Sequence, residues 1–109
     1  MQDTTITAGD PVTTLINVFT VRPEHQRGLV ETLTRATEER MRHVPGFVSA
    51  NIHAADDGTK VVNYAQWESA EHYRAMLADP ANHGHMREAA ALAESFEPHL
   101  YTVESVHHS

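Results

Sequence analysis

Cysteine is absent from this chain of 109 residues, and basic side chains are few. Without thiols the protein has no disulfides, thiolate nucleophiles, iron–sulfur ligands or cysteine zinc sites. Eight Lys and Arg against fifteen Asp and Glu leave a formal net charge of -7. Because such a balance gives none of the positive field that phosphate backbones require, we expect no nucleic-acid partner.

Long apolar runs are missing as well. Nowhere do about 18 consecutive apolar residues occur, as a membrane-spanning helix would need, and the segment before Pro11 lacks the basic start and apolar core of a secretory signal. We therefore expect a cytoplasmic protein with no membrane partner. Residues 1–11, rich in Thr, Gly and Asp, are expected to be a flexible N-terminal arm, and residues 12–109 a single domain.

Apolar periodicity predicts seven elements in the order βαββααβ. Alternating apolar side chains indicate strands, and apolar side chains at three- and four-residue steps indicate helices. We expect strands over residues 12–21, 47–54, 59–68 and 100–106, and helices over residues 24–43, 70–78 and 82–96. The boundaries come from an N-cap at Ser69 and from prolines that interrupt the pattern, namely Pro23, Pro45, Pro80 and Pro98.

This order predicts an α+β fold of the ferredoxin-like type. Right-handed crossovers give an antiparallel sheet with the helices on one face, the second helix being split. The strand over 47–54 is expected to present Val48, Ala50 and Ile52 to the helix-free face, and such an apolar surface needs a cover. Because a domain of this size cannot bury both faces of its sheet alone, we expect a homodimer that forms a dimeric α/β-barrel.

Polar and aromatic side chains gather on the helix-facing side of the strand over 59–68. A period of two places Asn63 and Trp67 on one face, roughly 13 Å apart at about 3.3 Å per residue. Tyr73 follows in the next helix and Arg87 in the third helix, both in elements that must cover this face. A buried carboxamide such as that of Asn63 is costly unless its hydrogen bonds are met, which indicates a binding cavity.

The length of the hairpin loop at Asp57-Gly58 decides which side chains of the preceding strand also face the helices. We expect a three-residue loop that pairs Ala55 with Thr59. The cross-strand pairs would then be Asn51 with Asn63, Phe47 with Trp67, and His53 with Val61.

Four motifs of this sequence resemble those of the antibiotic biosynthesis monooxygenase family. They are Val44-Pro45-Gly46-Phe47, Asn51-Ile52-His53-Ala54, Asp57-Gly58-Thr59 and Asn63-Tyr64-Ala65-Gln66-Trp67-Glu68-Ser69. The last run is the most specific, and the resemblance extends over about residues 12–106. It is strongest to the cofactor-independent anthrone and phenol monooxygenases of polyketide pathways such as that of actinorhodin.

The resemblance implies a set of catalytic residues. In such members an Asn and a Trp four residues apart, with a Tyr, an Arg and a His at fixed spacings, line the substrate cavity. The matching positions here are Asn63, Trp67, Tyr73, Arg87 and His53. Haem-degrading members use an Asn on the first strand, matched by Asn17, and a Trp on the second helix, where Met76 stands. The substrate-binding candidates are Phe47, Asn51, Asn17 and Met76.

The family's activity implies a reaction in which a polycyclic phenol, anthrone or hydroquinone is oxidised by O2 to a quinone without a cofactor. The substrate must first be deprotonated, and His53, with a reference pKa of about 6.5, is the expected base. Three alternatives from other classes remain open. They are a haem-binding or haem-degrading protein of the same fold, a non-catalytic dimeric module that binds aromatic ligands, and a cyclase or isomerase.

Nine histidines raise the further question of a metal site. His83 and His85, two residues apart, could chelate a metal, but no carboxylate or third histidine has a spacing that completes the coordination. We expect no metal.

Overall fold

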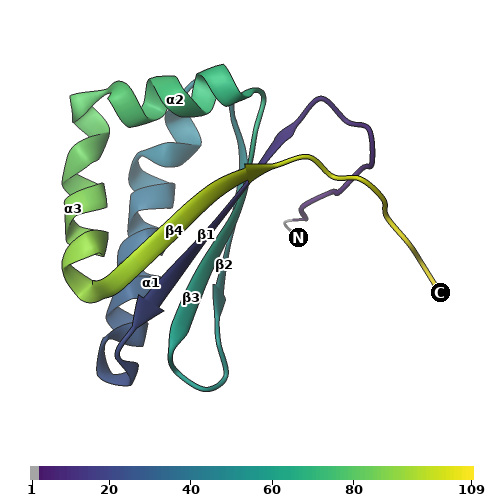
Figure 1. Ribbon diagram of the computed structural model, residues 1–109. Coiled ribbons are helices and arrows are strands. Elements are labelled where there is room, and N and C mark those ends of the chain that lie inside the picture. The colour runs from purple at the N-terminus through teal and green to yellow at the C-terminus, as the bar shows by residue number, and fades with distance from the viewer. Residues whose placement is uncertain (1–2) are drawn as a thin grey trace.

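The computed structural model describes residues 3–109 and confirms the ferredoxin-like fold and the order βαββααβ. Its elements are β1 Thr13–Val21, α1 Pro23–Glu39, η1 Met41–His43, β2 Phe47–Ala54, β3 Lys60–Trp67, α2 Ala70–Ala78, η2 Pro80–Asn82, α3 His83–Leu92 and β4 Ala93–Tyr101. The sheet has the order β2-β3-β1-β4, with every neighbouring pair antiparallel. The helices cover one face, and the sheet does not close on itself within one chain (Figure 1).

The first helix forms for the reasons that the sequence suggests. Pro23 occupies its first turn, where a missing N–H costs nothing, and its buried residues Leu29, Thr32 and Ala36 recur at three- and four-residue steps. The helix ends at Glu39, and a 3₁₀ turn, η1, follows where the prediction continues the helix to residue 43. No helix within residues 3–109 combines the length and apolar character needed to cross a membrane.

The C-terminal boundary differs from the prediction. Helix α3 ends at Leu92 and β4 begins at Ala93, so the predicted helix over 82–96 is too long and the predicted strand over 100–106 starts too late. Pro98 lies inside β4, opposite Asn17. This is possible because β4 is an edge strand, where a residue without an N–H leaves no neighbouring strand unpaired.

The β2–β3 hairpin has a loop one residue longer than predicted. The Ala55 N–H donates to Lys60 O (3.0 Å), so residues 56–59 form a four-residue loop, and Gly58 supplies the positive φ of 82°. Asn51 therefore lies opposite Tyr64, and His53 opposite Val62. A slip of one residue exchanges the two faces of a strand, so the prediction that Asn51 and His53 face the helices is wrong.

The same slip changes the predicted helix-free surface. Ala50 and Ile52 pack against the core on the helix side, and Val48 lies exposed at an irregularity of β2. The expected apolar patch of Val48, Ala50 and Ile52 is therefore wrong. The irregularity restores the pairing of Phe47 with Trp67, which confirms that part of the predicted register.

The described part of the N-terminal segment contacts the helix-free face. Thr4 Oγ1 donates to Asn51 Oδ1 (2.6 Å), and Gln66 Nε2 donates to Thr5 O (2.8 Å). Both ends of the described chain lie on the side of the sheet away from the helices (Figure 1). The carboxamides on this face consequently have structural partners.

Two buried apolar clusters fill the space between the sheet and the helices. The first comprises Leu15, Ala65, Trp67, Tyr73 and Met76, and the second Phe19, Val21, Leu29, Val61 and Ala89. On β1 and β3 the two clusters meet at a single rung, where Asn17 lies opposite Asn63. The alternation of each strand thus places two polar side chains in the middle of an apolar face.

Candidate active site

A cavity of about 230 Å³ lies between the sheet and the helices at this rung. Residues of β1, β3, β4 and all three α-helices line it, and most of them are apolar. The lining includes Met41, Met76 and Met86. Because methionine side chains are flexible and polarizable, these walls can adapt to a flat aromatic guest.

Several polar atoms around this cavity are buried without a hydrogen-bond partner within residues 3–109. They are Oδ1 of Asn17, Oδ1 of Asn63 and Nδ1 of His85, all from residues that line the cavity. A buried polar atom without a partner costs about 1–3 kcal/mol, and such atoms are rare in folded proteins. Their concentration in one cavity indicates a place where a polar ligand group supplies the missing hydrogen bonds.

The two asparagines are direct cross-strand neighbours. Asn17 of β1 pairs with Asn63 of β3, and directly opposite residues of an antiparallel pair have Cβ atoms about 4.5–5.5 Å apart. The sequence predicts both residues as site candidates, and the structure brings them together in the cavity. On the β2 side of Asn63, the hairpin register puts Ile52 in the place predicted for Asn51, and Asn17 pairs with Asn63 from the β1 side.

An aromatic group adjoins the cavity at its β3 end. Trp67 is 2% exposed and its indole Nε1 has no hydrogen-bond partner within residues 3–109. The Phe47 ring packs edge-on against it at 5.7 Å between centroids, and the Tyr73 ring lies at 6.0 Å. Tyr73 itself lines the cavity, so Trp67 lies directly behind that wall.

Helix α2 holds the tyrosine in place. Ser69 caps this helix by accepting the His72 N–H at 3.1 Å, and the first turn thereby directs Tyr73 and Met76 into the core. Burial raises the pKa of the Tyr73 phenol above its usual value near 10. Tyr73 is therefore a neutral phenol at physiological pH, able to donate a proton but not to accept one.

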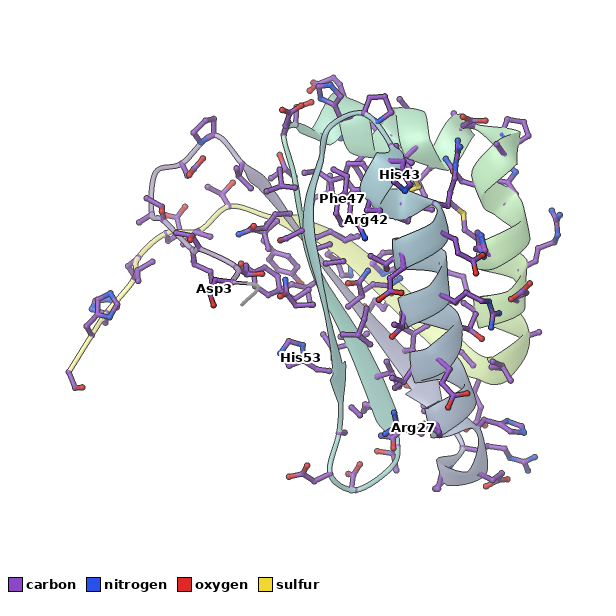
Figure 2. The ribbon with its side chains drawn as sticks, turned by 180° about the vertical axis from the view of Figure 1, so that it is seen from behind. Asp3, Arg27, Arg42, His43, Phe47 and His53 are labelled. Atoms are coloured by element: carbon purple, nitrogen blue, oxygen red, sulfur yellow. The ribbon has the colours of Figure 1, made fainter. Side chains whose placement is uncertain are left out.

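Five of the predicted site residues do not line the cavity, namely Trp67 and Phe47, which lie behind the Tyr73 wall, and His53, Asn51 and Arg87. His53 is exposed on the helix-free face, with Nδ1 at 3.1 Å from Asn51 O, and projects away from the helices (Figure 2). Asn51 donates to Tyr64 O (3.0 Å) and accepts from Thr4, so its polar atoms are used structurally. Arg87 is exposed on α3, since a residue two positions after His85 points to another side of a helix.

His85 is the cavity residue whose role sequence reasoning missed. The sequence suggests it only as a candidate metal ligand together with His83. The helical period offers a better signal, because His85 and the buried Ala89 are four residues apart on one face of α3. His83 does not line the cavity, and its Nε2 lies 2.7 Å from the backbone oxygen of Leu77. Within residues 3–109 no three His, Asp or Glu side chains are grouped to hold a metal.

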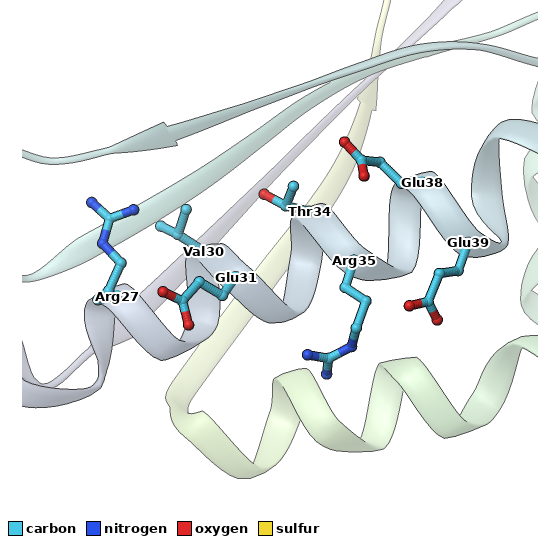
Figure 3. A pocket seen from close by; sticks show the side chains of 7 residues that line it. All are labelled: Arg27, Val30, Glu31, Thr34, Arg35, Glu38 and Glu39. Carbon is cyan, nitrogen blue, oxygen red and sulfur yellow. The ribbon is translucent and has the colours of Figure 1, made fainter.

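A second hollow of about 390 Å³ runs along α1 (Figure 3). A single helix supplies its whole lining, which is largely charged and exposed, as with Arg27, Glu31 and Glu38. Arg35 is also engaged in an ion pair with Glu88 of α3 (2.7 Å). This hollow is a solvated surface groove, and none of the unpartnered buried groups found among residues 3–109 lines it.

Comparison with known sequences matches this chain to a described family and to a known enzyme. Residues 13–92 match the model of the family described as antibiotic biosynthesis monooxygenase. Tetracenomycin-F1 monooxygenase of Streptomyces glaucescens is 54% identical over 76 residues, which cover 70% of this chain and 68% of that protein.

Two solved structures from Streptomyces are similar to this chain. A monooxygenase from the gene ActVA-Orf6 of Streptomyces coelicolor, in complex with nanaomycin D, has a TM-score of 0.76 and 36% identity, and the match covers 89% of this chain and 91% of that one. A mutant of SnoaB, described as a cofactor-independent oxygenase from Streptomyces nogalater, has a TM-score of 0.77 and 25% identity, and the match covers 88% and 96% of the two chains.

Proposed function

Because this chain is a monooxygenase belonging to the antibiotic biosynthesis monooxygenase family, we propose that it oxidises a polycyclic phenol or anthrone to a quinone with O2 and without a metal, haem or flavin. One observation carries the proposal. An apolar cavity contains the two adjacent carboxamides of Asn17 and Asn63, each with a buried oxygen that lacks a partner. Such a cavity suits a flat apolar ring system that bears hydroxyl or carbonyl groups.

The reaction needs an electron-rich substrate. Dioxygen is a triplet, so its direct two-electron reaction with a singlet phenol is spin-forbidden, whereas a delocalised phenolate or anthrone anion can pass one electron to O2. The two radicals combine to a peroxide at the ring carbon. Protonation, cleavage of the O–O bond and loss of the remaining C–H proton then give the carbonyl and one water. One oxygen atom of O2 enters the quinone and the other leaves as water.

The cavity residues have distinct tasks in this proposal. The Nδ2 groups of Asn17 and Asn63 donate to the substrate oxygen that carries the developing negative charge, because hydrogen bonds to a developing anion strengthen in the transition state, and their Oδ1 atoms accept from a substrate hydroxyl. Trp67 lies behind the Tyr73 wall, and in this proposal its unpartnered indole N–H donates toward the substrate at the β3 end of the cavity. Tyr73, which keeps its proton, is suited to protonate the peroxide.

The cavity is smaller than the roughly 300 Å³ at which small-molecule sites usually begin. Its lining includes apolar residues that are open to solvent, with Leu77 at 40% and Phe96 at 53% exposure. We infer that one part of the ring system enters between the sheet and helices and that the rest extends past Leu77 and Phe96.

The test is oxygen uptake with a panel of anthrones and polycyclic phenols. Protein treated with a chelator and free of haem and flavin should consume one O2 for each quinone formed, followed by an oxygen electrode and by quinone absorbance. Loss of activity on chelation with recovery on adding a metal would contradict the proposal. If the compounds bind without oxygen uptake, the protein would be a non-catalytic binding module. If a Soret band appears on haem titration, it would be a haem protein.

We further propose that two chains pair through their helix-free sheet faces. In one chain the sheet is open, and this face carries Ile16, Val18, Val62 and Tyr64, which alternate with the cavity-facing residues of β1 and β3. A second copy would cover these side chains and complete a barrel.

Light scattering should therefore give twice the chain mass of 12.1 kDa at micromolar concentration. Val18→Lys should shift the particle toward the monomer, because it buries an unpaired charge in the proposed interface. The matched change Glu38→Lys on exposed α1 should leave the mass unchanged. A wild-type mass near that of one chain would disprove the pairing.

A further inference from the structure

The cavity lining contains two ionisable side chains, Tyr73 and His85. Within residues 3–109, no Asp, Glu, Lys or Arg lines it. Tyr73 holds its proton too tightly to serve as a base near neutral pH, because burial raises its pKa. An imidazole, by contrast, ordinarily titrates near neutral pH, with a reference pKa of about 6.5. Within residues 3–109, His85 is consequently the one lining side chain with a basic nitrogen that can accept a proton.

The surroundings of His85 leave its ring free for this task. Its Nδ1 is buried and has no hydrogen-bond partner within residues 3–109. Neighbouring charges on the packed elements are engaged or directed elsewhere. Glu88, one turn further along α3, pairs with Arg35 of α1 at 2.7 Å, and Arg87 is exposed. The β4 residues that line the cavity, Phe96 and Pro98, are uncharged.

We infer that His85 is the general base of the reaction, an assignment that rests on the proposed function. Its unprotonated ring nitrogen accepts the proton of the phenol O–H or the anthrone C–H, which gives an imidazolium and the substrate anion. The anion is oxidised by O2, which is reduced to the peroxide bound at the ring carbon. The imidazolium returns its proton to the peroxide, directly or through Tyr73, the O–O bond breaks, and the departing hydroxide leaves as water with the remaining C–H proton of the ring carbon.

The first experiment compares His85→Gln with His83→Gln. Glutamine keeps a polar side chain of similar length but does not titrate near neutral pH. His85→Gln should lower kcat about a hundredfold, the lower range for loss of a general base, and remove the acidic limb of the pH–rate profile. His83→Gln should keep both, since His83 lies outside the cavity lining and contacts Leu77 O.

The second experiment works without oxygen. At neutral pH, an anaerobic complex of wild-type protein with a polycyclic phenol should show the red-shifted absorption band of the phenolate. The corresponding complex of His85→Gln should show the absorption band of the neutral phenol. If His85 only packs in the cavity wall, the two complexes should show the same absorption band. His85→Asn, with urea midpoints for all variants, provides a second test if His85→Gln folds poorly.

The outcomes separate the two proposals. Wild-type turnover with an unchanged rate and pH profile in His85→Gln would overturn the base assignment and leave the proposed function standing, as would loss of activity in His53→Gln alone. An anaerobic phenolate band that depends on His85, together with no oxygen uptake by the wild type, would overturn the proposed function and support the assignment of the base.

Discussion

Replacing Trp67 by phenylalanine is expected to slow quinone formation about a hundredfold, the effect of removing one donor aimed at developing charge. The exchange deletes the indole N–H, whose nitrogen is buried without a partner within residues 3–109. Most of the ring remains to pack against Phe47 and Tyr73. Since the lost group makes no hydrogen bond to any residue of the described range 3–109, the free energy of unfolding should change by less than about 1.5 kcal/mol.

The measurement pairs rates with stability. Quinone formation gives kcat and KM, urea unfolding gives the free energy of unfolding, and Phe47→Leu serves as the control. That control loosens the aromatic packing around Trp67 and keeps the N–H, so it should lower stability at least as much as Trp67→Phe while changing the rate far less. If both variants lose rate in proportion to stability, Trp67 acts through packing and its proposed role is wrong.

The features that could be predicted from the sequence are those that depend on nearby residues alone. Alternation along a strand is set by backbone geometry, so Asn63 and Trp67 on the helix side followed from their spacing alone. The N-cap Ser69 likewise gave the start of α2 and with it the buried position of Tyr73. The pairing of Phe47 with Trp67 was also correct, although the irregularity near Val48 that produces it was not foreseen.

The sequence did not predict two kinds of feature. One depends on the exact length of a loop, and the other on which strands and helices pack beside an element. The hairpin turns through residues 56–59, and this single added residue moves Asn51 and His53 to the helix-free face. Pro98 suggested a stop, yet it is tolerated because β4 pairs only with β1. The place of His85 depends on how α3 packs over the sheet, which no local pattern specifies alone.

The Asn17–Asn63 pair provides the second large effect, and it should separate stability from activity. Asn63→Val replaces a carboxamide whose buried oxygen lacks a partner with an apolar side chain that favours strands. The protein should become more stable by about 1 kcal/mol, which raises the Tm of a domain of this size by about 4–8 °C. Oxidation should nevertheless slow at least about a hundredfold, because the substrate oxygen loses its partner.

Asn51→Val is the matched control for this change. Asn51 lies on the neighbouring strand and its amide donates to Tyr64 O at 3.0 Å and accepts from Thr4, so the same substitution removes hydrogen bonds that the folded chain makes. Its Tm should fall, whereas that of Asn63→Val should rise. Asn17→Val and the double variant complete a cycle in which two side chains that bind one substrate oxygen show non-additive losses of rate. A lower Tm together with normal turnover in Asn63→Val would mean that the carboxamide serves the fold and not the substrate.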